Sequence, residues 1–169
     1  WIISDENFWT SKAVNYLKLK TGWGITGNAA IPNYLFLDLV GFSQRPYAGE
    51  DPFLFPTQID NPNLKWETSN NFDIGIELGV LENRLLFELS YYKRWSRDVL
   101  LNVSLPRYNG FGNFWDNVAK IENSGIEFNF TARIIEHDKF QWTSVFNIAH
   151  NDNKITSIGQ WSEDAVGGG

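Results

Sequence analysis

Apolar and polar residues alternate along several stretches of the chain, with the two-residue period of a β-strand. In the clearest stretch every second side chain is apolar: Phe72, Ile74, Ile76, Leu78 and Val80. The positions between them are polar or small: Asn71, Asp73, Gly75, Glu77 and Gly79. A strand with two such faces separates either a protein core from water or lipid from a water-filled lumen.

The same period predicts five strands, at residues 14–25, 67–80, 85–95, 117–135 and 140–150. Residues 1–3 are a candidate tail of a preceding strand, and Ser4 is a candidate cap of a short helical turn. The connections alternate in length, being long at 27–65, short at 81–84, long at 96–116, short at 136–139 and long again from 151. An antiparallel meander places every second connection on the same side of its sheet.

This sorting of loop lengths favours a barrel in an outer membrane, where short turns face the periplasm and long loops face outside. A soluble β-sandwich has no physical reason to sort its loops in this way. We therefore predict an all-β fold, namely an antiparallel up-and-down transmembrane β-barrel segment of about five to six strands. So few strands cannot close a barrel. Residues 1–169 are accordingly interpreted as a partial barrel domain of a longer protein.

The predicted lipid-facing residues are Phe72, Ile74, Ile76, Leu78, Ile126, Phe128 and Phe130. The 27–65 connection holds five of the six prolines, and a loop of that length is usually functional. The alternative that stays open is an all-β surface module that binds without transporting.

Composition supports the membrane interpretation and argues against several other classes of function. Aromatic residues make up 16% of the chain and include eight Trp, the residue type that forms girdles at membrane interfaces. The net charge of −6 argues against a nucleic-acid partner. The absence of Cys excludes disulfides and thiolate metal sites. No apolar run of about 18 residues is present, so no membrane helix is expected.

Four short motifs, in order between residues 14 and 158, resemble one family. They are Gly24-Ile25-Thr26-Gly27-Asn28, Asn61-Pro62-Asn63-Leu64-Lys65-Trp66-Glu67-Thr68, Asp98-Val99-Leu100-Leu101, and the stretch from Asn117 to Glu127. Together they are similar to SusC/RagA-type TonB-dependent transporters of Bacteroidetes outer membranes. Two departures are Trp23, where Tyr is usual, and Ala119, where Gly is more common.

The resemblance implies more than these residues contain. Such transporters have a plug domain, a segment that contacts the TonB complex, and a barrel of about 22 strands. They import glycans or peptides and pair with a SusD-like surface lipoprotein. By this resemblance the chain supplies later barrel strands and lies among outer-membrane lipid, while the plug and the remaining strands are absent from it.

The best candidate binding residues are four aromatic side chains in the 96–116 connection. Aromatic faces stack on sugar rings and fill peptide pockets, whereas loop packing or a membrane girdle is the competing interpretation. We predict no catalytic residue, no cofactor and no metal site. His137 and His150 are expected at opposite ends of strands, and the acidic residues Glu50, Asp51 and Asp60 lack the regular spacing of a calcium loop. The candidate ligand or lid contacts are Tyr108, Phe111, Phe114 and Trp115.

Overall fold

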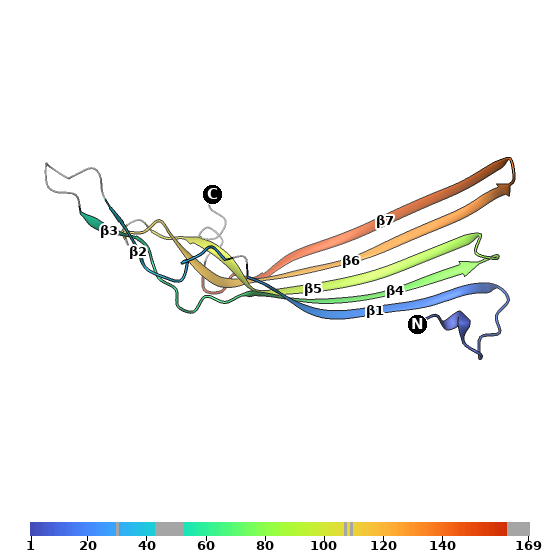
Figure 1. Ribbon diagram of the computed structural model, residues 1–169, viewed down its shortest axis with the longest axis horizontal. Helices are drawn as coiled ribbons and strands as arrows, with labels where there is room; N and C mark the ends of the chain where they lie inside the picture. Colours follow the sequence, from blue (N-terminus) through green and yellow to red (C-terminus); the bar gives the residue numbers. More distant parts are fainter. Residues whose placement is uncertain (30, 43–52, 107, 109, 162–169) are drawn as a thin grey trace. The chain divides into compact units, whose positions relative to one another are not determined.

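The computed structural model describes residues 1–29, 31–42, 53–106, 108 and 110–161. Two sheets are present among these residues, and Figure 1 labels their strands. The larger sheet has the order β1 (Val14–Asn28), β4 (Glu67–Val80), β5 (Leu85–Ser104), β6 (Asn113–His137) and β7 (Phe140–Ser157). The smaller is an antiparallel pair, β2 (Leu39–Phe42) and β3 (Leu54–Gln58).

Strands that neighbour each other in the larger sheet follow each other along the chain, once the β2–β3 pair is set aside. This order confirms the predicted all-β, up-and-down arrangement. The sheet is open because the chain is a segment of a barrel. Within the described residues, no helix is long and apolar enough to cross a membrane.

The chain divides into two compact units, which we describe separately. The wall unit consists of residues 1–26, 70–95 and 122–154. The loop unit consists of residues 27–69, 96–121 and 155–169, described as far as residue 161.

The wall unit is a single layer of sheet whose apolar side chains have little to pack against. Phe87 stacks on Phe130 with ring centroids 4.8 Å apart, so neighbouring strands share an apolar face. Ile76 and Ile126 on that face remain 40% and 50% exposed. Among the described residues of this unit, the buried apolar side chain is the small Ala132. Such exposure is unfavourable in water and suits a face that meets hydrocarbon.

The two short turns close hairpins close to where the sequence predicts them. Residues 81–84 form the first turn, in which Leu81, Glu82 and Asn83 all adopt left-handed backbone conformations with φ of 53°, 57° and 61°. The backbone N–H of Glu82 donates to Oδ1 of Asn15 at 2.7 Å, which fixes the turn against β1. The second turn is shorter than predicted, at residues 138–139, because β6 continues to His137.

The long connections are more ordered than predicted. The predicted loop 96–116 is wrong over most of its length, because β5 continues to Ser104 and β6 begins at Asn113. Asp98 lies inside β5 with a left-handed φ of 55°, which interrupts the two-residue alternation that strand prediction depends on. The predicted loop 27–65 contains the β2–β3 pair, and β7 continues beyond residue 150 to Ser157.

The first residues pair with the edge of the larger sheet. The terminal ammonium of Trp1 donates to the carbonyl of Leu19 at 2.9 Å, and the Leu19 N–H donates back at the same distance. Ile2 forms an isolated antiparallel bridge with Lys18, so strand-like pairing is present at the start of the chain, whereas Ile3, predicted in the same tail, begins a 3₁₀ helix. The predicted Ser4 cap is wrong, because Ser4 lies inside the 3₁₀ helix η1 (Ile3–Asp5) and its N-cap, Ile2, makes no capping bond.

Candidate functional site

The four predicted aromatic residues lie in different settings. Tyr108 is 87% exposed, and Phe111 is half-buried just before β6. Phe114 and Trp115 belong to β6 rather than to a loop, and the Phe114 ring lies 6.3 Å from that of Trp161. The structure therefore presents Tyr108 to solvent and ties Phe114 into local packing.

A group of polar side chains that sequence reasoning did not assign to any role organises the loop unit. We call Asn61, Glu67 and Asn117 the clasp, because each bonds to the main chain or side chain of a neighbouring segment. Asn61 is 6% exposed, and its Nδ2 donates to the carbonyl of Trp115 at 2.9 Å. Its Oδ1 accepts the Asn63 N–H at 3.1 Å. This amide joins the segment before β4 to β6.

Asn117 makes the most complete set of clasp contacts. Its Oδ1 accepts the Lys65 N–H at 2.7 Å, and its Nδ2 donates to the Lys65 carbonyl at 2.9 Å. The same Nδ2 donates to the carbonyl of Asp98 at 2.7 Å. Asp98 is the left-handed residue of β5, so Asn117 supplies a partner at an irregular position of that strand.

Glu67 completes the clasp at the first residue of β4. Its Oε1 accepts the backbone N–H of Leu100 in β5 at 2.9 Å. Its Oε2 accepts Nδ2 of Asn28, the last residue of β1, at 2.9 Å. The four motifs quoted from the sequence thus meet at one place, since they contribute Asn28, Glu67, Leu100 and Asn117. The Asn and Glu residues of these motifs could have drawn attention to the site, but nothing in their spacing along the sequence indicated that they are in contact.

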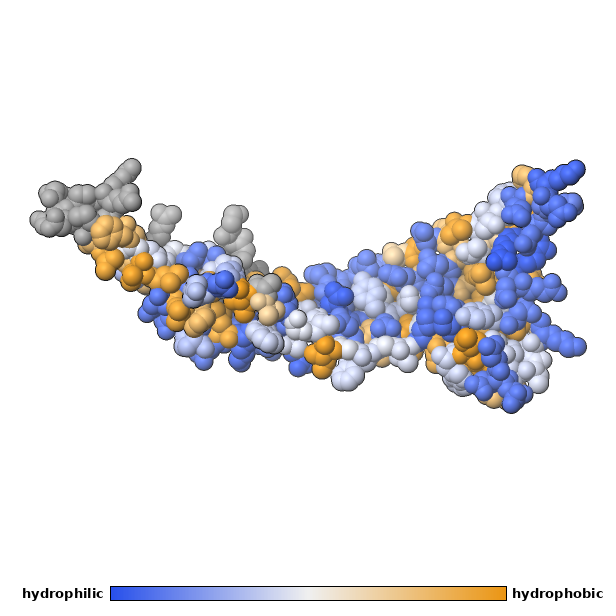
Figure 2. Space-filling view, viewed as in Figure 1, coloured by the Kyte–Doolittle hydropathy of each residue, from blue (hydrophilic) through white to orange (hydrophobic). Residues whose placement is uncertain are grey.

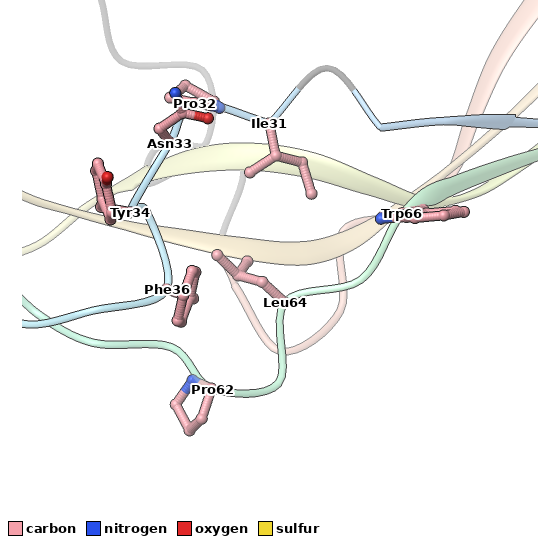
Figure 3. Close-up of a pocket in the computed structure, with 8 residues that line it drawn as sticks. All are labelled: Ile31, Pro32, Asn33, Tyr34, Phe36, Pro62, Leu64 and Trp66. Atoms are coloured by element: carbon pink, nitrogen blue, oxygen red, sulfur yellow. The ribbon is translucent and has the colours of Figure 1, made fainter.

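Beside the clasp is an open pocket of about 530 Å³, lined mostly by residues of apolar and aromatic type but with polar and apolar groups both exposed in it. Figure 3 shows its lining residues, which are Ile31, Pro32, Asn33, Tyr34, Phe36, Pro62, Leu64 and Trp66. Three aromatic rings and two proline rings suit either an apolar peptide side chain or the flat face of a sugar ring.

The β2–β3 pair carries several exposed apolar residues. Figure 2 shows hydrophobic side chains gathered over these two strands. Val40, Phe42 and Leu54 are each more than 60% exposed. Gln58 holds the base of the pair, since its Nε2 donates to the carbonyls of Tyr34 and Leu37 at 3.1 and 2.7 Å. A contiguous exposed apolar surface on an ordered support marks an interaction site.

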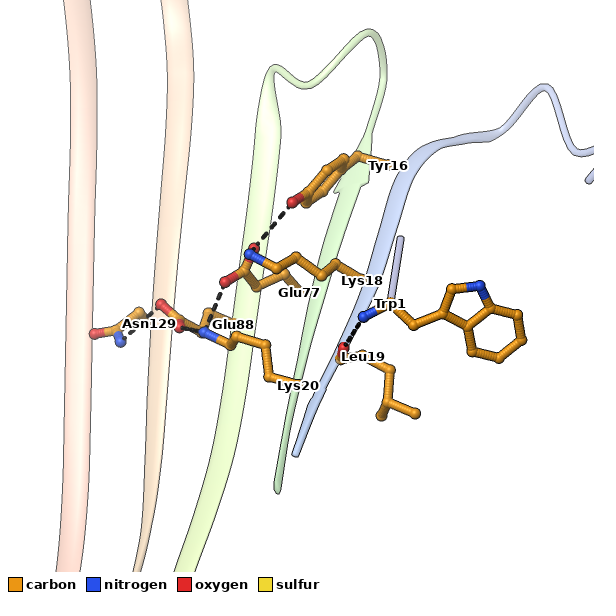
Figure 4. A network of polar contacts seen from close by, with 8 residues as sticks. All are labelled: Trp1, Tyr16, Lys18, Leu19, Lys20, Glu77, Glu88 and Asn129. Atoms are coloured by element: carbon orange, nitrogen blue, oxygen red, sulfur yellow. Dashed lines mark hydrogen bonds and ion pairs between the residues drawn. The ribbon is translucent and has the colours of Figure 1, made fainter. Parts of the chain in front are cut away.

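The polar face of the wall unit carries a ladder of opposite charges across β1, β4 and β5 (Figure 4). Lys20 lies between Glu77, 2.6 Å away, and Glu88. Tyr16 donates to Glu77 at 3.2 Å, and Asn129 of β6 donates to Glu88 at 3.4 Å. These charges are paired and half-exposed, as expected for a face that meets water inside a barrel.

Charged residues stand at both ends of the apolar face of the wall unit. By the pleat of β6, apolar side chains share one face from Ile126 to Ile134, while Glu122 and Glu136 stand on the same face beyond them. Glu122 pairs with Lys93 at 3.2 Å, and the Lys93 ammonium lies 5.1 Å from the centre of the Trp95 ring. A Trp beside a charge at the end of an apolar band is typical of a membrane interface.

Of the residues considered for metal binding, the structure describes Asp60, His137 and His150. Among the described residues, no group of three or more His, Cys, Asp or Glu side chains is close enough to hold a metal ion. Glu50 and Asp51 lie outside the described residues. His137 ends β6, and His150 lies within β7 rather than at its end.

Comparison with known proteins gives a consistent result. The chain matches the family model "TonB dependent receptor-like, beta-barrel" over residues 4–168. It is 35% identical over 161 residues to TonB-dependent receptor P26 of Formosa agariphila, covering 94% of this chain and 16% of that protein. It is 34% identical over 167 residues to TonB-dependent receptor SusC of Bacteroides thetaiotaomicron, with the same coverages.

Solved structures of the RagAB system resemble the chain. The RagAB peptide importer in its "closed-closed" state matches with a TM-score of 0.82 and 28% identity, covering 94% of this chain and 17% of that chain. The chain thus spans about one sixth of the length of the proteins it matches. The resemblance to SusC/RagA-type transporters is confirmed. The chain forms part of an outer-membrane barrel and belongs to the TonB-dependent receptor β-barrel family.

Proposed function

We propose that the protein to which this chain belongs is a TonB-dependent importer of glycans or peptides that works with a SusD-like surface lipoprotein. The observation that carries the proposal is a single-layer sheet with one charge-paired face and one exposed apolar face, within a chain of the TonB-dependent receptor family. On this proposal the chain supplies barrel wall and extracellular loops. The plug and the segment that contacts TonB belong to other parts of the protein, and the protein has no enzymatic activity.

The dimensions of the apolar band support a membrane-spanning wall. Ile126 to Ile134 covers eight residue steps of β6, about 27 Å along the strand. At a tilt of about 40° this is about 21 Å of height, close to the roughly 25 Å apolar band of such barrels. The short turn at 81–84 then faces the periplasm, and the loop unit faces outside.

The pocket and the β2–β3 pair are the proposed contact surfaces for cargo and lid. One similar structure is named a peptide importer, which makes peptides a cargo class to test first. The aromatic lining of the pocket equally accepts a sugar ring. Tyr108, Phe111, Phe114 and Trp115 remain candidate ligand or lid contacts, among which the exposed Tyr108 is the most accessible.

Uptake measurements on cells that produce the full-length protein test the proposal. Labelled oligopeptides and oligosaccharides are supplied with and without an uncoupler that removes the energy source of TonB. We expect accumulation of one cargo class that the uncoupler abolishes, and co-purification of a lipoprotein lid. Replacing Tyr34 and Phe36 by Ala should weaken uptake, whereas Asn102→Ala, an exposed change in β5, should not. Surface binding of cargo without energy-dependent accumulation would favour the alternative, a binding module that does not transport.

A further inference from the structure

We infer that the clasp is a positioning device, which holds the pocket and the β2–β3 pair in the arrangement that binds cargo. The inference rests on the proposed function for what is bound. Its structural part stands on contacts within the loop unit alone.

The clasp acts where the regular hydrogen-bond ladder stops. Residues 59–66 connect β3 to β4 and lie outside both strands. Their backbone groups need partners from elsewhere. Asn117 bonds to both the N–H and the carbonyl of Lys65, as a neighbouring strand would do. Asn61 anchors the start of the same segment through its buried amide.

The clasp and the pocket draw on the same segment. Asn61 and Glu67 make clasp bonds through their side chains, and Lys65 does so through its backbone N–H and carbonyl. The even-numbered residues Pro62, Leu64 and Trp66 line the pocket. Figure 3 shows Pro62, Leu64 and Trp66 following one another along the same stretch of chain, with Leu64 directed toward Phe36. Because clasp-bonded and pocket-lining residues are direct neighbours in this segment, loss of the clasp bonds is expected to release the pocket wall.

The β2–β3 pair is joined to the clasp through a short chain of contacts. The backbone N–H of Asp60 donates to Oδ1 of Asp38 at 2.9 Å, and Gln58 bonds to the carbonyls before β2. Asn61 follows directly and bonds to Trp115 and Asp116 of β6. The exposed apolar pair is therefore linked to β6 through a series of side-chain hydrogen bonds.

The substitution Asn117→Asp tests the inference with almost no change in size. A carboxylate still accepts the Lys65 N–H, but it faces the carbonyls of Lys65 and Asp98 without a proton to donate. The two carbonyls lose their donor and face a negative charge, so the segment is held less tightly. We therefore expect hydrogen–deuterium exchange in residues 53–67 of the full-length protein to rise about tenfold. Exchange in 14–25 and 72–80 should be unchanged.

The matched control is Asn102→Asp, which places the same charge change on an exposed residue of β5. We expect wild-type exchange in this control. If Asn117→Asp fails to reach the membrane, Glu67→Gln is measured in its place, because an amide nitrogen cannot accept the bond from Leu100 or Asn28. Exchange in residues 53–67 that equals wild type in the assembled variant would overturn the inference.

A functional readout separates positioning from stability. Uptake is normalised to the amount of assembled transporter. We expect the half-saturating cargo concentration to rise about fivefold with the maximal rate per transporter unchanged. A loss of assembled protein with unchanged half-saturation would mean that the clasp is structural only, and would overturn the positioning role. A rise in exchange together with no energised uptake by the wild-type protein would refute the proposed function while leaving the structural part of the inference intact.

Discussion

The wall unit and the loop unit use their polar side chains in different ways. In the wall unit, side chains bond mainly to other side chains across strands, as Lys20 does with Glu77 and as Tyr92 does with Asn151 at 2.7 Å. In the loop unit, Asn117 and Gln58 bond mainly to main-chain groups. A regular ladder satisfies its own backbone and leaves side chains available for the faces, whereas irregular backbone requires side chains as partners.

The first way to test this difference is to place a charge on the apolar face of the wall unit. Ile76→Arg near the centre of the band should cost roughly 2–4 kcal/mol. Glu77→Gln on the opposite face should cost about 1 kcal/mol or less, because its ion pairs are partly exposed. Urea-induced unfolding of the full-length barrel in lipid vesicles measures both. Equal tolerance at the two positions would show that the apolar face does not meet lipid.

The second test concerns close packing between strands of the wall unit. A methyl group at Gly125 would lie 2.7 Å from Cε1 of Tyr92 and 2.8 Å from the backbone oxygen of His150. Since a backbone oxygen cannot move aside, Gly125→Ala should destabilise the barrel by about 1–3 kcal/mol. Gly24→Ala is the control, because nothing lies within 4 Å of its added methyl group. The difference in gel mobility between unheated and heated samples measures the folded fraction of the barrel. Equal folded fractions for the two variants would contradict the packing argument.

The third test concerns the irregular position in β5 and has the smallest expected effect. Asp98→Val places a β-branched residue in a left-handed conformation, at a cost of about 1–2 kcal/mol. Asp98→Gly keeps that conformation accessible and should leave the clasp in place. Hydrogen–deuterium exchange at Leu100 measures the outcome, since its N–H bonds to Glu67. Faster exchange in the Gly variant than in the Val variant would contradict the role of backbone conformation.

Prediction from sequence succeeded where apolar and polar residues alternate over the whole length of a hydrogen-bonded strand. β4 was predicted at 67–80 and forms over Glu67–Val80 because its apolar and polar positions alternate up to the left-handed turn. β5 was predicted to end nine residues early, because Asp98 breaks the period and the apolar run from Val99 to Leu101 follows. The β2–β3 pair escaped prediction because Pro56 lies within β3, where proline usually argues against a strand.

The candidate site was predicted less completely than the wall. Aromatic residues near strand ends are recognisable by type, so Tyr108 was selected, but the pocket residues Tyr34 and Phe36 were passed over within a proline-rich segment. The clasp was missed for a physical reason. Asn61 and Asn117 are 56 positions apart in the sequence, and a single amide that bonds to distant backbone has no periodic signature.

The location of the clasp at the base of both long connections has a consequence for how such barrels diversify. Glu67 and Asn28 close the first connection at its two ends, while Asn117 and Asp98 lie on the strands that flank the second. Insertions or deletions between Asn28 and Gln58, or between Ser104 and Asn113, leave the three clasp residues in place. A segment such as 31–58 can therefore be exchanged between relatives as a cassette, which changes what the surface recognises without rebuilding the wall that carries it.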